Sequence, residues 1–154
     1  MAARGMTKFV GASIMLLGFG SALAFAGAAD DAIKARQACM KSHGASMGIM
    51  VPMIKGEKPY DGAAIQETLA KEEVACADWA KFWGPDTMKG ETVETYAKPE
   101  IWSDAKGFEE AGGAWYKAFV AVKGSTDEAS FKAAFPALGA ACQACHEKFR
   151  RPKD

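Results

Sequence analysis

The sequence predicts an all-α protein built as an antiparallel four-helix bundle. Four segments of about 20 residues each repeat apolar side chains in steps of three and four, which is the spacing of an amphipathic helix. No segment alternates apolar and polar residues as a half-buried strand does. Short connections join the segments in two pairs, and a short connection makes two neighbouring helices antiparallel.

The composition fits a single domain with a hydrophobic core. The chain has 154 residues, of which 49% are hydrophobic, and this is enough apolar material for one core. The 19 basic and 19 acidic side chains balance, which argues against a nucleic-acid binder that depends on a positive surface. No apolar run inside the chain is long enough to cross a bilayer, so a protein with several membrane spans is also excluded.

The N-terminal segment has the order of a secretory signal peptide. Arg4 and Lys8 come first, an uncharged apolar stretch spans residues 9–25, and small residues follow. We expect residues 1–28 to be cleaved and residues 29–154 to form the mature domain. An uncleaved membrane anchor is the alternative, although the apolar stretch is short and interrupted by glycines. Export would bring the domain, without a membrane span, to the periplasm, where thiols can be oxidised.

The first two helices are predicted over about residues 31–54 and 61–83. A Gly-Glu-Lys-Pro break at 56–59 separates them. Asp61 is placed to cap the second helix, because a carboxylate accepts hydrogen bonds from the free N–H groups of a first turn. The apolar stripe of the second helix comprises Ile65, Leu69, Cys76, Ala80 and Trp83.

The third helix is predicted over about residues 99–123, and the fourth follows it to the C-terminal region. Pro99 suits a first helical turn. Ser125 and Glu128 predict a capping box for the fourth helix, and Pro136 is expected to kink that helix or to restart it. The apolar stripes comprise Ile101, Ala105, Phe108, Gly112, Trp115, Phe119 and Val122 in the third helix, and Phe131, Phe135, Leu138, Cys142, Cys145 and Phe149 in the fourth.

A C-x-x-C-H motif near the C-terminus carries the chemistry of the chain. Cys142, Cys145 and His146 stand at positions i, i+3 and i+4, which share one face of a helix. Two thiols at this spacing can form thioethers with the two vinyl groups of a porphyrin, while the adjacent imidazole binds the iron. The motif therefore predicts one covalently attached haem c with His146 as an iron ligand.

Two other uses of paired cysteines fit the chain less well. A thioredoxin-type C-x-x-C opens a helix within a βαβ unit, whereas this pair ends the last helix of a chain without predicted strands. A zinc ribbon needs a second close pair of cysteines, and Cys39 and Cys76 are isolated.

Cys39 and Cys76 are nearly symmetric about the turn between the first two helices. They lie 18 residues before and 19 residues after Glu57, so equal helical rise puts them at similar height in an antiparallel hairpin. A disulfide and two buried free thiols both remain open, because the height of two residues does not fix which way their side chains face.

Four sequence blocks resemble the cytochrome c′ family, and especially its low-spin, methionine-ligated branch. The blocks are Arg-Gln-Ala-Cys-Met at 36–40, Gly-Glu-Lys-Pro-Tyr-Asp at 56–61, Pro-Glu-Ile-Trp at 99–102 and the C-x-x-C-H block at 142–150. The resemblance spans the mature domain. It implies a four-helix bundle, often a homodimer, with one covalent haem near the last helix.

The resemblance also assigns further site residues. It implies that Met40 faces the distal side of the iron, that Arg36 and Gln37 lie near a haem propionate, and that Arg150 lies near the proximal imidazole. Of the remaining polar groups, His43 is expected to face solvent, and the charged run at 71–73 is expected to be a solvated face.

Two functions follow, and the sixth iron position separates them. If Met40 binds the iron beside His146, the chain is a soluble periplasmic electron carrier that exchanges electrons with redox partner proteins, because a thioether ligand favours ferrous iron. If Met40 only packs over the ring, the iron is five-coordinate and binds nitric oxide or carbon monoxide. No general base, nucleophile or substrate pocket stands out, so a turnover enzyme is not predicted.

Overall fold

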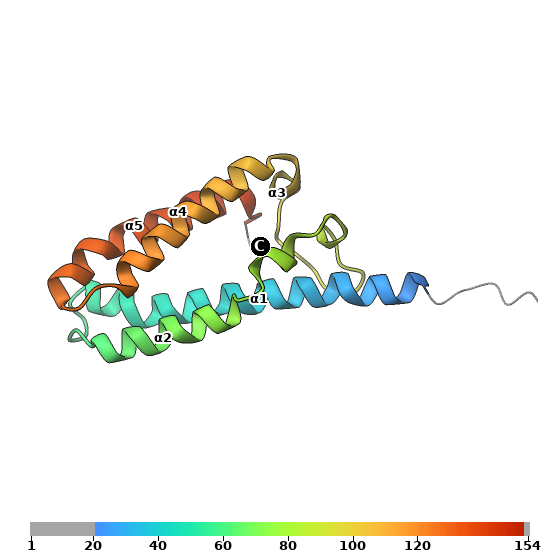
Figure 1. The fold of residues 1–154 in the computed structure, drawn as a ribbon. Coiled ribbons are helices and arrows are strands. Elements are labelled where there is room, and N and C mark those ends of the chain that lie inside the picture. The colour runs from blue at the N-terminus through green and yellow to red at the C-terminus, as the bar shows by residue number, and fades with distance from the viewer. Residues whose placement is uncertain (1–20, 153–154) are drawn as a thin grey trace, which may run out of the picture.

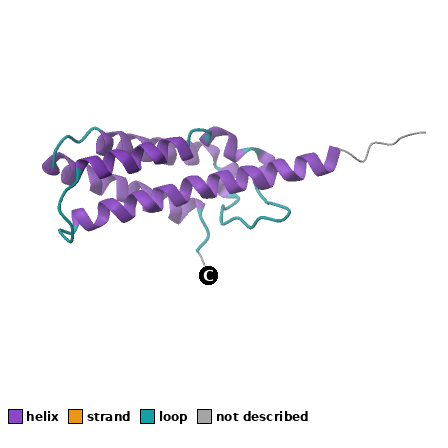
Figure 2. Cartoon of the chain, turned by 90° about the horizontal axis from the view of Figure 1, so that it is seen from below, coloured by secondary structure: helices purple, strands orange, loops and turns teal. Residues whose placement is uncertain are grey.

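The computed structural model describes residues 21–152, with side chains from residue 27 onward. Much of the predicted signal peptide therefore lies outside the described residues. No strand occurs in the described part of the chain (Figure 2), as the sequence predicts. The elements are α1 (Ser21–Ile54), α2 (Gly62–Ala75), the 3-10 turns η1 (Trp79–Trp83) and η2 (Pro85–Thr87), α3 (Glu100–Ser103), α4 (Ala105–Lys123) and α5 (Glu128–Phe149).

Two helical hairpins form the bundle. One contains α1 and α2, and the other contains α4 and α5. The hairpins converge at the end that holds both of their connecting turns and diverge toward the opposite end (Figure 1). The predicted antiparallel four-helix bundle is confirmed. Within the described residues, no helix combines the length and apolar character that a membrane span requires.

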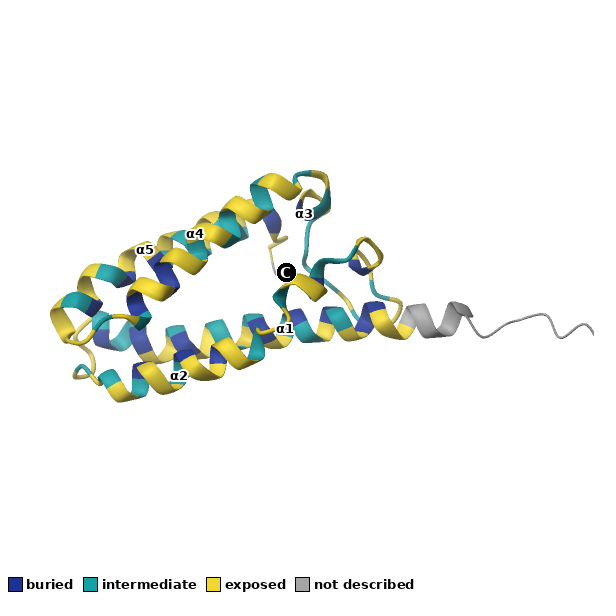
Figure 3. Ribbon diagram, viewed as in Figure 1, coloured by how far each residue is buried: buried dark blue, intermediate teal, exposed yellow. Residues whose placement is uncertain are grey.

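The main hydrophobic core lies where the hairpins converge, and buried residues of both hairpins face one another there (Figure 3). Burying each large apolar side chain stabilises the fold by about 1.5–3 kcal/mol. This core holds the hairpins together at one end and leaves the other end to the side chains described below. Its buried members are Met50, Met53, Ile65, Leu69, Ala118, Phe119, Val122, Phe131, Phe135 and Leu138.

The first hairpin turn forms as its sequence predicts. Gly56 adopts a φ of 73°, a left-handed conformation that glycine tolerates best. It lets the N–H of Glu57 donate to the carbonyl of Pro52 at 2.8 Å, which closes α1 with a Schellman motif. Asp61 then caps α2, and its Oδ1 accepts from the N–H of Ala64 at 3.0 Å.

Two predicted helix limits in this hairpin are wrong. Helix α1 already includes Ser21, the first described residue, rather than starting near residue 31, because the alanine-rich stretch before residue 31 has high helix propensity. Helix α2 ends at Ala75 rather than near Trp83, and the chain continues through the 3-10 turn η1. No glycine or proline marks this end. The tertiary contacts of Cys76 and the tryptophans decide it.

The predicted third helix is two helices, because Asp104 interrupts it. Asp104 has φ −122° and ψ 58°, and its side chain caps α4 by accepting from the N–H of Gly107 at 3.1 Å. An aspartate competes with helical hydrogen bonding in this way when its carboxylate can reach backbone N–H groups. The same carboxylate binds Nζ of Lys148 on α5 at 2.5 Å, so the break also ties α4 to α5.

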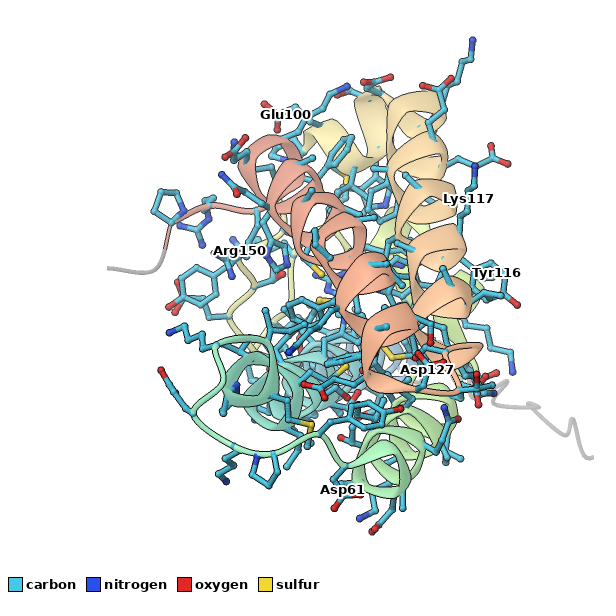
Figure 4. The ribbon with its side chains drawn as sticks, turned by 90° about the vertical axis from the view of Figure 1, so that its left-hand side faces the viewer. Asp61, Glu100, Tyr116, Lys117, Asp127 and Arg150 are labelled. Atoms are coloured by element: carbon cyan, nitrogen blue, oxygen red, sulfur yellow. A yellow bond between two sulfur atoms is a disulfide. The ribbon has the colours of Figure 1, made fainter. Side chains whose placement is uncertain are left out.

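The start of α5 also differs in detail from the prediction. Asp127, rather than Ser125, is the capping residue, and it forms a reciprocal capping box with Ser130. Helix α5 then runs through Pro136 without the predicted restart. Asp127 and Arg150 mark its two ends (Figure 4).

Candidate haem-binding site

The C-x-x-C-H motif lies on the C-terminal half of α5, toward the end where the hairpins diverge. Cys142 and Cys145 are free thiols, and both are half-buried, as is His146. Cys142 packs against the main hydrophobic core. All three residues belong to one regular helix, so the i, i+3 and i+4 spacing places them on one face.

Burial sets the protonation of this motif. It raises the pKa of the Cys142 and Cys145 thiols and lowers the pKa of the His146 imidazole, and the Arg150 guanidinium lowers the His146 pKa further. The imidazole is therefore neutral near pH 7, which is the form that binds a metal ion.

His43 points into the bundle, so the expectation that it faces solvent is wrong. Its side chain is only 15% exposed, and its ring stacks on Trp115 of α4 with centroids 4.8 Å apart. Burial, with the charge of His146 as a second cause, lowers the pKa of His43 to about 4. Arg36, His43 and Met50 are spaced by seven residues, a helical repeat that could have identified this buried stripe.

A disulfide joins Cys39 on α1 to Cys76 at the end of α2, with Cα atoms 4.9 Å apart. The sequence left this pairing open, and the structure contains it. Nε2 of His43 lies 3.6 Å from Sγ of Cys39 and 3.3 Å from Sγ of Cys76. The disulfide therefore crosslinks the first hairpin next to Met40.

Glu72 contacts His43 and is buried, so it is not part of a solvated face as predicted. Its Oε1 lies 3.4 Å from Nε2 of His43. Burial raises the pKa of Glu72, and a hydrogen bond from Ser46 partly opposes that effect. Glu72 falls four residues before Cys76 and three after Leu69, so the apolar stripe of α2 already included its position.

Arg36 is buried without a carboxylate partner. Its guanidinium donates to the carbonyls of Phe82 at 3.2 Å and Thr87 at 3.0 Å and to Oγ1 of Thr95 at 2.7 Å. It also lies over the ring of Trp83, 5.1 Å from the centroid. Burial lowers its pKa to about 10. No acidic side chain among residues 27–152 pairs with it, and a buried unpaired charge is costly.

The Trp83 side chain beside the Arg36 guanidinium also lacks a hydrogen-bond partner in the described part of the chain. Nε1 of Trp83 is buried and has no hydrogen-bond acceptor within the described residues. Buried donors are nearly always satisfied in native proteins. A buried guanidinium and an unmet N–H at the same place fit an anionic group, and haem brings two propionates, so these residues fit the predicted cofactor.

The other predicted residues have more peripheral contacts. Gln37 donates to the backbone carbonyl of Glu94 at 2.7 Å, which fastens the long connection before α3 to α1. Met40 is half-buried and is not one of the buried core residues. Arg150 is exposed, and its backbone forms an isolated bridge with Ala97.

A cavity of about 570 Å³ opens between α2, η1 and α4, a size typical of small-molecule sites. Its walls include the aromatic side chains of Trp79, Phe108 and Trp115, and it reaches Cys76 and Trp83. Cys142, Cys145 and His146 do not line it. The cavity therefore reaches the disulfide and Trp83 but not the C-x-x-C-H motif, which lies on α5. Sequence patterns did not indicate this opening.

The chain is similar to several known proteins. The family model described as Cytochrome C' matches residues 31–150. "Cytochrome c'" of Alcaligenes xylosoxydans xylosoxydans is 35% identical over 128 residues, covering 80% of this chain and 96% of that protein. "Cytochrome c-556" of Rhodopseudomonas palustris is 34% identical over 127 residues, covering 80% of this chain and 85% of that protein.

Solved structures agree with this likeness. Cytochrome c' from Rubrivivax gelatinosus superimposes with a TM-score of 0.72 at 31% identity, covering 80% of this chain and 97% of that chain. A nitric oxide complex of a variant of cytochrome c prime from Alcaligenes xylosoxidans superimposes with a TM-score of 0.69 at 35% identity, covering 81% and 97%. The chain therefore belongs to the cytochrome c′ family, whose members carry covalently attached haem c.

Proposed function

We propose that this chain is a haem c protein that binds nitric oxide at a five-coordinate iron held by His146. The similarity to a cytochrome c prime that was solved as a nitric oxide complex carries this proposal. Bound haem supplies an iron that can take a diatomic gas or exchange an electron.

The residues of α5 attach the cofactor. Cys142 and Cys145 would form the two thioethers, and their half-buried positions on one helical face support this role. His146 would bind the iron through its neutral imidazole, since burial lowers the pKa of His146 and keeps it unprotonated near pH 7.

The first hairpin would bind the charged edge of the cofactor. The Arg36 guanidinium carries a buried charge without a carboxylate partner, and the Trp83 N–H beside it lacks an acceptor. A propionate placed there would satisfy both groups. Gln37, whose amide already donates to the carbonyl of Glu94, would act indirectly by fixing the loop that holds Arg36.

The position of Met40 supports an open sixth site. Met40 is half-buried and contributes nothing to the main core. The Cys39–Cys76 disulfide also fixes the adjacent backbone to α2.

An electron carrier with Met40 and His146 as axial ligands is the second candidate. A thioether side chain is present on the helix that faces α5, and a thioether ligand favours ferrous iron and raises the potential. The partners would then be redox proteins that reduce and oxidise the haem.

The spectra of the holoprotein in both oxidation states, with Met40→Leu as the diagnostic variant, test the proposal. We expect a high-spin ferrous protein that binds nitric oxide, with spectra and affinity nearly unchanged in Met40→Leu. Low-spin spectra in both oxidation states that become high-spin in Met40→Leu would instead establish the electron carrier.

The same proposal places the mature domain in the periplasm. The N-terminal charge and hydropathy pattern and the Cys39–Cys76 disulfide support this location, because disulfides persist in oxidising compartments. The mass of haem-bearing chain from a periplasmic extract tests it. We expect a chain that lacks the first 26 to 28 residues by the small-residue cleavage rule, and a full-length chain would contradict the predicted cleavage.

A further inference from the structure

We propose that reduction of the Cys39–Cys76 disulfide converts the polar cluster around His43 into a zinc site. The ligands are the two cysteine thiolates, the His43 imidazole and the Glu72 carboxylate. The site uses no residue of the C-x-x-C-H motif on α5, and it makes the first hairpin a redox-dependent metal binder.

The four ligands arise from one simple pattern on two packed helices. Cys39 and His43 are four residues apart on α1, and Glu72 and Cys76 are four residues apart across the end of α2. Residues at i and i+4 share one helical face. The hairpin brings these two pairs together, so each helix contributes one sulfur and one nitrogen or oxygen atom.

The distances from the imidazole already match a zinc tetrahedron. Nε2 of His43 lies 3.6 and 3.3 Å from the two sulfur atoms and 3.4 Å from Oε1 of Glu72. Zinc bond lengths of about 2.0 Å to nitrogen or oxygen and 2.3 Å to sulfur give tetrahedral edges of about 3.3 Å between nitrogen and oxygen and about 3.5 Å between nitrogen and sulfur. The ligand atoms of Cys39, His43 and Cys76 all lie within 4.8 Å of one another.

Two features have to change: the edge between the two sulfur atoms has to lengthen, and the Glu72 carboxylate, which contacts His43 but is not part of the cluster of Cys39, His43 and Cys76, has to move toward the sulfur atoms. In the disulfide neither sulfur is a thiolate, and a zinc tetrahedron needs the two about 3.8 Å apart. A dithiol supplies two electrons and two protons, becomes a disulfide itself, and leaves Cys39 and Cys76 as thiols. Zinc binding then releases those two thiol protons to solvent.

The structure also provides a route for the reductant. Cys39 is completely buried, but Cys76 lines the open cavity between α2, η1 and α4. A thiolate entering this cavity would attack Sγ of Cys76 and form a mixed disulfide there. Sulfur and nitrogen donors with one carboxylate favour zinc over calcium or magnesium, which prefer oxygen ligands.

Zinc binding by the purified holoprotein tests the proposal. Attached haem consumes the thiols of Cys142 and Cys145, so a phosphine reductant exposes only Cys39 and Cys76. Zinc chloride is added to oxidised and reduced samples, and native mass spectrometry counts the metal. We expect one zinc per reduced chain and at least 100-fold weaker binding by the oxidised chain. Equal zinc retention by both samples would overturn the proposal, and this comparison requires no variant.

Variants then identify the ligands. His43→Phe keeps an aromatic ring against Trp115, and Glu72→Gln keeps the size of the side chain. Each should weaken zinc binding by the reduced chain at least tenfold. Glu73→Gln is the matched control, because Glu73 is exposed and pairs with Lys123 instead, and it should bind zinc normally. Wild-type affinity in His43→Phe or Glu72→Gln, with unchanged helical circular dichroism, would overturn the ligand set.

Discussion

The two hairpins of the bundle have different interior faces. The α1–α2 hairpin buries the polar side chains of Arg36, Ser46 and Glu72 and carries a disulfide. The α4–α5 hairpin has no disulfide within its described residues and buries apolar side chains almost throughout. Its buried residues are Ala118, Phe119, Val122, Phe131, Phe135, Leu138 and Phe149.

The two hairpins are therefore stabilised in different ways. The apolar hairpin, which carries the C-x-x-C-H motif on α5, obtains its stability from side-chain burial. The polar hairpin gains less from burial, because each buried polar group needs a partner. A crosslink between Cys39 and Cys76 offsets that loss in the hairpin that buries Arg36 and Glu72.

We expect the largest effect from removing the two cysteines of the C-x-x-C-H motif. A Cys142→Ser/Cys145→Ser double variant should lose covalent haem completely, because a hydroxyl does not add to a vinyl group in place of a thiol. Haem staining of a denaturing gel measures this. A stained band in the variant would show that the polar hairpin, rather than α5, carries the tether.

A core substitution should show how much the apolar hairpin depends on burial. Phe131 is completely buried, so Phe131→Ala should lower the free energy of unfolding by about 3–5 kcal/mol in urea titrations. Tyr116→Ala is the control, because Tyr116 is 62% exposed and projects away from the bundle (Figure 4). The control should change stability by less than about 0.5 kcal/mol. Equal losses in both variants would contradict the comparison.

Loss of the crosslink should weaken the polar hairpin by a comparable or smaller amount. The Cys39–Cys76 bond closes a loop with a sequence separation of 37 residues. A Cys39→Ala/Cys76→Ala variant should lose about 2–4 kcal/mol of unfolding free energy, mainly because the unfolded chain gains freedom. Hydrogen exchange should locate the increased opening in α2 rather than in α5. An equal loss of exchange protection in α2 and α5 would mean that the two hairpins open together as one unit.

The smallest effect concerns the link between α4 and α5. The hydrogen bond from Lys148, with the N–H of Gly107, lowers the pKa of Asp104 below its ordinary value of 3.8. The folded chain therefore holds this proton less tightly than the unfolded chain, and the stabilisation is present above that value and lost as pH falls below it. Asp104→Asn should abolish this acid-dependent part of the thermal midpoint. An unchanged pH profile would show that the contact contributes nothing.

Periodicity and breakers predicted most of the fold. The four long helical segments, the Gly56 turn and the Asp61 cap all follow from local rules that one segment of sequence contains. The helix break at Asp104 and the early end of α2 do not, because contacts between segments decide them. The cap of α5 was misplaced for another reason, because Asp127 and Ser130 form a local capping box that the prediction of Ser125 and Glu128 overlooked.

The polar residues of the candidate site were harder to place. His43 and Glu72 both occupy buried stripe positions, yet their side chains are typical of helix surfaces. Their spacing from Arg36, Met50, Leu69 and Cys76 contained the signal. The C-x-x-C-H motif was recognisable because its chemistry depends on adjacent residues, whereas the cluster around the disulfide exists only after two helices pair.

The crosslink in the first hairpin also bears on how the chain matures. Four cysteines can be fully paired in three ways, and each of them oxidises both thiols of the C-x-x-C-H motif. Only a single bond between Cys39 and Cys76 leaves Cys142 and Cys145 reduced together. Those two partners are also synthesised first, more than sixty residues ahead of the motif. Early closure of this bond would keep Cys39 and Cys76 from pairing with the two thiols that the porphyrin needs.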